Sequence, residues 1–277
     1  MSMQLRNIFL AGIAAAAAVA FVSPAAGRGG HGLKTPSSSS SDSSSDTQQL
    51  PTGRDALRQI VQNMCVVNWL QHRTAAPCER VFLASPKLSD SGYAVLADRH
   101  GGAHYLLIPT QTVAGIESGE LLDPDMPNYF AEAWHARDLL ATFVGHDVPR
   151  TAIGLAVNAA RARTQDQFHI HIECLRPDVV EALRASAERI TDAWSPVDVA
   201  GSTYQGLRIM ADGLDGSNLF ELLATLKPDT RRHMGDYTLA VAGMQFKSGP
   251  GFIVLTGTGP SGELLLDSTC SVAGGGG

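Results

Sequence analysis

The chain lacks an excess of basic residues, since it has 21 Lys and Arg against 27 Asp and Glu and a net charge of −6 at pH 7. A protein that binds nucleic acid more often carries a basic excess, so this class is disfavoured. No Cys-x-x-Cys pair occurs among the 4 cysteines, which argues against thiol redox catalysis. The apolar fraction of 44% is nevertheless ample for a core, in one large domain or two small ones.

The N-terminus lacks the ~20 apolar residues that span a bilayer comfortably. Its apolar run is shorter, extends from Ile8 to Val22, follows Arg6 and precedes small residues at 23–26. These are the three parts of a secretory signal. We therefore expect residues 1–27 to be a signal peptide or an uncleaved membrane anchor, and the remainder of the chain to be exported.

Two stretches lack the apolar residues that a folded segment needs. Residues 28–53 contain Gly and a Ser-rich tract, and residues 273–277 are nearly all Gly. We expect a disordered linker and a disordered tail. The folded domain is therefore predicted to span residues 54–272.

Four cysteines in an exported chain favour disulfides, for which three pairings exist. We favour Cys65–Cys78, which closes a local loop worth about 3 kcal/mol in the chain-entropy model. The partner pairing, Cys174–Cys270, would attach the C-terminus to the central strand described next. The alternative is that one or more of the four are free buried thiols.

The central stretch is Gln165–Leu175, in which apolar and polar residues alternate. Such alternation predicts a β-strand, with Phe168, Ile170 and Ile172 on one face in a core. The other face would carry His169, His171 and Glu173 with Gln167, roughly 6.6 Å apart at alternate positions. Two imidazoles and a carboxylate in one row can act on a phosphate or bind a metal ion. The alternative is a polar strand face in contact with solvent.

The remaining pattern predicts an α+β fold. We expect a helix over 54–71 capped by Thr52, and another after Asn128 that extends to Val144 with Phe130, Trp134, Leu140 and Phe143 inward. Further expected elements are a hairpin (93–97 and 105–108), a strand (151–158), a helix from Pro177 to about Trp194, and a second hairpin (237–242 and 252–256). The second hairpin has a composition like that of the first, which suggests an internal duplication whose second unit covers about 195–272.

In this order, a hairpin, a helix, a strand and a His-x-His strand resemble the histidine-triad superfamily of nucleotide hydrolases and transferases. Asn158 and Gln165 lie eleven and four positions before His169, as is common in that superfamily, and Ile108-Pro109 ends the second strand of the hairpin. Several blocks are similar to the bacterial CDP-diacylglycerol pyrophosphatase family: Tyr105–Pro109, Gly115–Ser118, Ala136–Asp138, Arg163–Gln165, Phe168–Ile172, Cys174–Val179 and His233–Gly235. The resemblance implies a HIT-like antiparallel sheet with flanking helices, in one pseudo-dimeric chain.

The resemblance also implies roles for residues. His171 takes the place of the nucleophile that attacks the cytidylyl phosphorus of CDP-diacylglycerol, and phosphatidate and CMP are the products. The phosphoryl oxygens would be met by donors from His169, Gln165, Asn158 and Arg163. Tyr105, Leu107 and Ile108 would line the nucleoside pocket. Glu173 would accept a proton or orient water, and His233 would contact substrate or merely end a helix.

The same resemblance implies a lipid-nucleotide substrate at a membrane surface, in the periplasm or on the periplasmic side of the inner membrane. It implies no metal, no other cofactor, no nucleic acid and no obligate protein partner. Three alternatives stay open. A metal-dependent phosphohydrolase would use His169, His171 and Glu173 with a further ligand such as His104 or His146. The others are a binding protein without turnover, and a broader nucleotide-diphosphate hydrolase or CMP transferase.

Overall fold

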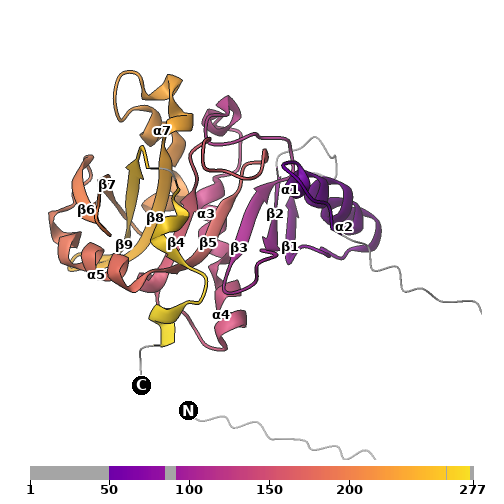
Figure 1. Cartoon of the computed structure of the whole chain (residues 1–277), viewed down its shortest axis with the longest axis horizontal. Helices are drawn as coiled ribbons and strands as arrows, with labels where there is room; N and C mark the ends of the chain where they lie inside the picture. Colours follow the sequence, from indigo (N-terminus) through magenta and orange to yellow (C-terminus); the bar gives the residue numbers. More distant parts are fainter. Residues whose placement is uncertain (1–49, 85–91, 260, 275–277) are drawn as a thin grey trace, which may run out of the picture. The chain divides into compact units, whose positions relative to one another are not determined.

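One antiparallel sheet organises the part of the chain that the structure describes (Figure 1). The structure is a computed structural model, and it describes residues 50–84, 92–259 and 261–274. These residues belong to the second of two units, 48–277. The expected signal peptide and most of the expected linker lie outside the described residues. Among the helices of the described ranges, none is long and apolar enough to cross a membrane.

The strand order across the described sheet is β1-β2-β3-β5-β4-β8-β9-β7-β6, and a short tenth strand, β10, pairs with β5. Every pairing is antiparallel. The bounds are β1 Arg80–Leu83, β2 Gly92–Ala97, β3 Tyr105–Pro109, β4 Ile153–Val157, β5 Ile170–Leu175, β6 Ser195–Val199, β7 Ser202–Met210, β8 Thr238–Phe246, β9 Gly249–Gly257 and β10 Leu266–Asp267. The predicted α+β class is therefore confirmed at this level.

Short helices connect the strands, and some follow one another along the chain with only a single turn of different winding between them. The α-helices are α1 Ala56–Ile60, α2 Val66–His72, α3 Tyr129–His135, α4 Leu139–Val144, α5 Pro177–Ser186, α6 Gly213–Gly216 and α7 Leu219–Ala224. A π-helical turn at Val61–Cys65 joins α1 to α2, and a 3-10 turn at Ala136–Asp138 joins α3 to α4. The two expected long helices, 54–71 and 129–144, are thus present with a local change of winding in each.

The caps of these helices differ from one another. The side chain of Asn128 accepts a hydrogen bond from the backbone N–H of Ala131 at 3.2 Å, as the sequence predicts for the start of α3. The expected cap of α1 by Thr52 is wrong, because the helix begins after Asp55 and no local side chain caps it. Instead Oε1 of Gln165 accepts from the N–H of Leu57 at 3.2 Å, so a distant loop supplies the cap.

The two faces of the sheet are covered differently (Figure 1). One face packs against α3, α4 and α7 and forms the largest core, which contains Phe168, Ile170 and Ile172 as the alternation predicts. On the other face, α1 and α2 cover the β1–β2–β3 end, where Leu96 and Leu106 lie. The same face is covered by α5 and the segment near β10 toward β6 and β9. His169, His171 and Glu173 point from β5 into the space between these two covers.

Several expectations need correction. The helix that starts at Pro177 ends in a 3-10 turn at Ala187–Arg189, so it does not reach Trp194. Phe143 is 53% exposed because α4 ends at the surface, where Gly145 adopts the left-handed conformation. The predicted tail begins too early, since Ser271–Gly274 form a 3-10 turn, and residues 275–277 lie outside the described ranges. β1, β6, β7 and β10 were not predicted.

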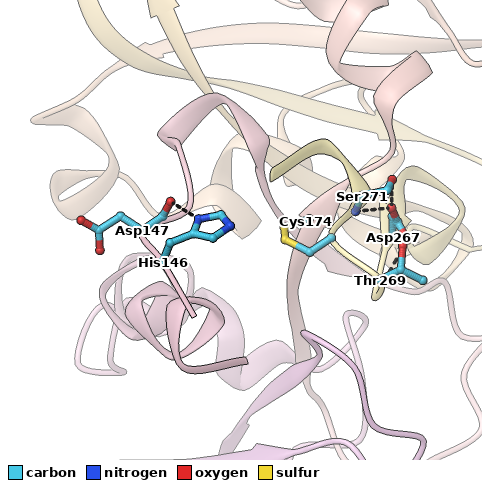
Figure 2. Close-up of a disulfide and its surroundings, with 7 residues drawn as sticks. His146, Asp147, Cys174, Asp267, Thr269 and Ser271 are labelled. Carbon is cyan, nitrogen blue, oxygen red and sulfur yellow. Dashed lines mark hydrogen bonds between the residues drawn. A yellow bond between two sulfur atoms is a disulfide. The ribbon is translucent and has the colours of Figure 1, made fainter. Parts of the chain in front are cut away.

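Both favoured disulfides are present. Cys65 and Cys78 join with Cα atoms 5.6 Å apart, and Cys174 and Cys270 join with Cα atoms 5.0 Å apart. Figure 2 shows the second bond beside Asp267, whose carboxylate accepts from the backbone N–H groups and hydroxyls of Thr269 and Ser271. Hydrogen bonds to Asp267 therefore hold the turn that carries Cys270, and the disulfide joins this turn to β5.

Candidate active site

A pocket of about 310 Å³ opens between the two covers, above the polar face of β5. That volume lies at the lower end of the range for small-molecule sites. One wall is apolar and comes from Leu57, Ile60, Leu96 and Leu106. The opposite wall is polar and is lined by Asp98, Arg99, His100, His104, Asn158, Gln165, His169, His171, Ser261 and Glu263.

The side chain of His171 is 6% exposed and both its nitrogens meet titratable groups. Nδ1 lies 2.9 Å from Nε2 of His104. Nε2 lies 2.8 Å from Oε1 of Glu263, at ion-pair distance. Nε2 is buried and this contact is not aligned as a hydrogen bond with any described residue. Because a carboxylate only accepts, it favours the tautomer with the proton on Nε2.

His104 completes the other side of this arrangement. It precedes β3 and lies opposite Glu173 of β5, because Tyr105 pairs with Ile172. Its Nε2 is 3.2 Å from Oε1 of Glu173, and its Nδ1 is 3.8 Å from Oδ1 of Asp98. Burial, followed by the nearby His171, lowers the pKa of His104 to about 4, so its ring is neutral at pH 7.

The two glutamates have opposite protonation states. Burial raises the pKa of Glu173 to about 8, with the charges of Glu263 and Asp98 adding to the effect. Glu173 is therefore mostly protonated at pH 7. The contact with His171 lowers the pKa of Glu263 to about 2, against the opposing effect of its partial burial. An ionised glutamate, Glu263, therefore lines the pocket beside Nε2 of His171, and a neutral one, Glu173, lies beside His104.

His169 is held by its own strand. Its Nδ1 lies 2.8 Å from the carbonyl oxygen of Gln167, and a carbonyl only accepts, so Nδ1 carries the proton. Burial lowers the pKa of His169 to about 4, which keeps the ring neutral. Its Nε2 then has a lone pair and no proton. The expected role of His169 as a donor to phosphoryl oxygens is inconsistent with this tautomer.

Asn158 lies at the end of β4 and connects the site to the C-terminal segment. Its Nδ2 donates to Glu263, and its Oδ1 accepts from the hydroxyl of Ser261 and from the N–H of Gly262, each at 2.9 Å. The amide therefore fixes the backbone that carries Glu263.

The side chains of Gln165 and Arg163 form contacts with other parts of the fold. Gln165 lines the pocket, but its Nε2 donates to the carbonyl of Gly53 at 3.0 Å while its Oε1 caps α1. The guanidinium of Arg163 pairs with Glu117 and with Asp166, and it does not line the pocket. The cation that lines the pocket is Arg99, from the turn between β2 and β3.

The residues expected to form the nucleoside wall do not line this pocket. Tyr105 and Leu107 point to the opposite face of the sheet and belong to the large core, and Ile108 packs under α1 and α2. None of these three lines the pocket, whose β3 residue is Leu106. The motif does not show which residues of β3 face the pocket. The pairing of β3 with β5 does, because it places Leu106 opposite His171.

His233 and His146 also lie outside the pocket. His233 is exposed between two 3-10 turns, which agrees with the interpretation as a helix-end residue. His146 is exposed, and its Nδ1 contacts the carbonyl of Asp147 at 3.1 Å, on the far side of Cys174 from Asp267 (Figure 2). It cannot complete a metal site with the histidines of β5.

Among the described residues, one group has the composition to hold a metal ion. It consists of His104, His171 and Glu173, whose nearest ligand atoms all lie within 4.8 Å of one another. The trio expected from the sequence contained His169, whereas this group contains His104 in its place. Two imidazoles and a carboxylate form a donor set that suits Zn²⁺. The same three groups also form the proton network described above.

The match to a protein-family model decides the family. Residues 52–274 match the model described as CDP-diacylglycerol pyrophosphatase. The chain belongs to this family. The match begins just before α1 and ends in the turn that follows Cys270, so it covers both walls of the pocket. The chain is accordingly a hydrolase of the CDP-diacylglycerol pyrophosphatase family, and CDP-diacylglycerol is the substrate that the family implies.

Reasoning from sequence missed several residues of this pocket, including Arg99. Glu263 and Ser261 lie in a segment with no recognisable motif, and only the fold brings that segment to His171. His104 was considered only as a further metal ligand. Its place could have been found, because a hairpin strand paired with β5 puts the residue before Tyr105 opposite Glu173. Leu50, from the end of the expected linker, also lines the pocket.

Proposed function

We propose that this chain hydrolyses the diphosphate of CDP-diacylglycerol to CMP and phosphatidate through a cytidylyl group on His171. The observation that carries the proposal is the position of Nε2 of His171: buried, at the pocket, and without an aligned hydrogen bond to a described residue. A covalent step divides one difficult displacement into two. His104 supports it, because its neutral ring at 2.9 Å can donate to Nδ1 and so hold the orientation of the imidazole that attacks.

The pocket has complementary walls for such a substrate. The diphosphate would lie over the polar wall, near Arg99 and the backbone at Ser261–Glu263. The apolar wall of α1 and β2–β3 would contact the less polar part of the lipid nucleotide. Action at a membrane surface on the periplasmic side, after export directed by residues 1–27, remains part of the proposal. We propose 54–272 as the catalytic domain.

The test of the reaction is product analysis in water enriched in oxygen-18. Attack by His171 on the cytidylyl phosphorus, followed by water, places the label in CMP and leaves phosphatidate unlabelled. Label in phosphatidate would contradict the proposal. CDP-choline and ADP-ribose serve as comparison substrates, and comparable turnover of all three would favour a broader nucleotide-diphosphate hydrolase. An added alcohol acceptor that receives CMP would favour a transferase.

His169 is the competing nucleophile, and a specific observation favours it. The carbonyl of Gln167 holds its Nδ1, which leaves Nε2 with a free lone pair in a neutral ring. An imidazole in this state can attack directly, whereas Nε2 of His171 must first pass its proton to Glu263. Matched His169→Ala and His171→Ala variants distinguish the two, because only loss of the true nucleophile abolishes cytidylylation of the protein.

A metal-dependent hydrolase is the second candidate, favoured by the grouping of His104, His171 and Glu173. This candidate predicts that purified protein carries about one equivalent of metal and that a chelator abolishes hydrolysis. Full activity of metal-free protein would exclude it. A binding protein without turnover would give neither product.

We also propose a HIT-like, internally duplicated architecture, supported by the strand order. Outward from the β4–β8 pair, the order is β4-β5-β3-β2 on one side and β8-β9-β7-β6 on the other. Each half therefore consists of a hairpin followed by a second antiparallel pair, in the same chain order. On this basis β8 and β9 correspond to β4 and β5, and not to β2 and β3 as the sequence comparison assumed. β9 contains no histidine, so only one half carries the site.

A further inference from the structure

Glu263 is the polar group in the pocket whose place the family motifs do not explain. It follows β9 on a 3-10 turn, Glu263–Leu265, in the second half of the sheet. Its Oε1 lies 2.8 Å from Nε2 of His171, the atom that would bond to phosphorus. A substrate phosphorus that bonds to Nε2 must therefore occupy the space where this carboxylate now lies.

The side chain is able to withdraw without leaving the site. Glu263 is 41% exposed at its side chain, whereas His171 is 6% exposed, so the carboxylate is the group with room to move. Its backbone is fixed, because Asn158 accepts from the N–H of Gly262 and the hydroxyl of Ser261. A carboxylate displaced from Nε2 by the phosphorus would remain in the pocket that it lines, where water reaches the adduct.

We propose that Glu263 is a catalytic residue that carries the proton in both halves of the reaction. This rests on the proposed covalent function. In the first half, Nε2 passes its proton to Glu263 and forms the bond to the cytidylyl phosphorus, while the bond from phosphorus to the phosphatidate oxygen breaks. Glu263 then gives that proton to the departing phosphatidate.

In the second half, a water oxygen bonds to phosphorus and one water proton goes to Glu263. The phosphorus–nitrogen bond breaks, and its electron pair returns to Nε2. CMP leaves, and Glu263 returns the proton to Nε2, which restores the starting contact. Protons and electron pairs balance over the cycle without any co-reactant other than water.

The two halves need the carboxylate to different degrees. A phosphate monoester has a second pKa near 6 and leaves with little help from an acid. Water has a pKa of 15.7 and is a poor nucleophile without a base. A positioned general base typically contributes 10²–10⁴-fold. In Glu263→Gln the side-chain amide can donate to Nε2 and favour the tautomer in which Nε2 is bare, so the first attack can still occur, but no base remains for water. The second half should therefore depend far more strongly on Glu263 than the first.

The experiment compares Glu263→Gln with the wild type in pre-steady-state release of phosphatidate and CMP from CDP-diacylglycerol. We expect a phosphatidate burst in the variant within about tenfold of the wild-type rate, followed by CMP release slowed about 100-fold or more. Cytidylylated protein should accumulate in the variant, as seen by intact mass. Glu181→Gln, at an exposed position of α5, is the matched control and should behave as wild type.

Two results would overturn the proposal. Equal losses in burst and turnover would mean that Glu263 only positions His171, and unchanged turnover would mean that it is not needed. Retained melting behaviour of Glu263→Gln separates these results from misfolding, and Glu263→Asp, which keeps a carboxylate, should recover part of the CMP release. Absence of a burst and an adduct in the wild type as well would remove the covalent function itself.

Discussion

Nε2 of His104, just before β3, lies 2.9 Å from Nδ1 of His171 on the neighbouring strand β5. The contact joins a residue before the hairpin strand to the proposed nucleophile, and Asp98 and Glu173 flank it. His104 is neutral at pH 7 because burial lowers its pKa to about 4. It therefore acts as a hydrogen-bond partner of His171 and not as a fixed positive charge.

Replacing His104 should lower the rate more than substrate binding. Loss of one hydrogen bond removes about 0.5–1.5 kcal/mol, and 1.36 kcal/mol corresponds to tenfold in rate. We expect His104→Ala to reduce kcat about tenfold with little change in KM, and His104→Gln, which keeps an amide donor, to recover part of it. Steady-state kinetics with CDP-diacylglycerol checks this. A rise in KM at unchanged kcat would instead make His104 a substrate-binding residue.

The buried Glu173 gives a prediction for stability against pH. Its folded pKa of about 8 lies above the ordinary value of 4.5, so the folded state retains a proton that the unfolded chain releases between these values. The stabilising contribution is complete below about pH 4.5 and is lost as pH rises through about 8. Glu173→Gln, which stays neutral, should therefore gain stability relative to wild type as pH rises.

The measurement is the difference in Tm between Glu173→Gln and wild type at pH 5 and at pH 9. We expect it to be larger at pH 9 by about 3 °C or more, since 1 kcal/mol corresponds to roughly 2–4 °C in a domain of this size. The exposed Glu181→Gln on α5 should show no such trend. A difference independent of pH would mean that Glu173 is ionised in the fold.

Arg99 and Arg163 offer a matched comparison of two cations near the site. Arg99 lines the pocket, whereas Arg163 pairs with Glu117 and Asp166 outside it. We expect Arg99→Ala to raise KM about tenfold, because a hydrogen bond to a charged group contributes about 1.5–3 kcal/mol and exposure reduces it. Arg163→Ala should lower Tm and leave KM nearly unchanged. The reverse pattern would restore the role that the motif implied for Arg163.

The Cys174–Cys270 disulfide closes a sequence separation of 96 residues, and Cys65–Cys78 closes 13. Replacing Cys174 and Cys270 together by Ala should lower the free energy of unfolding by about 2–4 kcal/mol. It should also lower kcat, because Cys174 adjoins Glu173 and the segment before Cys270 carries Glu263. Urea unfolding and kinetics test both. Lost stability with unchanged kcat would show that the site does not depend on this bond.

Local patterns predicted much of the fold. Alternation identified β5 and the face of each residue on it, and Asn128 marked the start of α3. β1, β6, β7 and β10 were missed because stretches of mixed polarity, such as Ser195–Val199, become strands only through pairing with neighbours that the sequence does not reveal. Thr52 was expected to cap α1 because it lies just before the helix in the sequence. The side chain that accepts from the first turn instead belongs to Gln165.

The candidate site was predictable only where it lies on one strand. His169 and His171 were found by spacing, and both line the pocket. The partners of their rings were not found by spacing. The carbonyl of Gln167 holds His169, and His171 meets His104 and Glu263, which lie far from it in the sequence. Those contacts depend on strand order and on the return of the chain after β9. No local spacing encodes either.

The most direct test is to quench the protein during turnover of CDP-diacylglycerol labelled in the cytidine and to map the peptide that carries β5. The account predicts a CMP adduct on His171, formed at the rate of phosphatidate release and absent from His171→Ala. An adduct confined to His169 would reassign the nucleophile, and CMP formed at the full rate by His171→Ala would contradict the central claim.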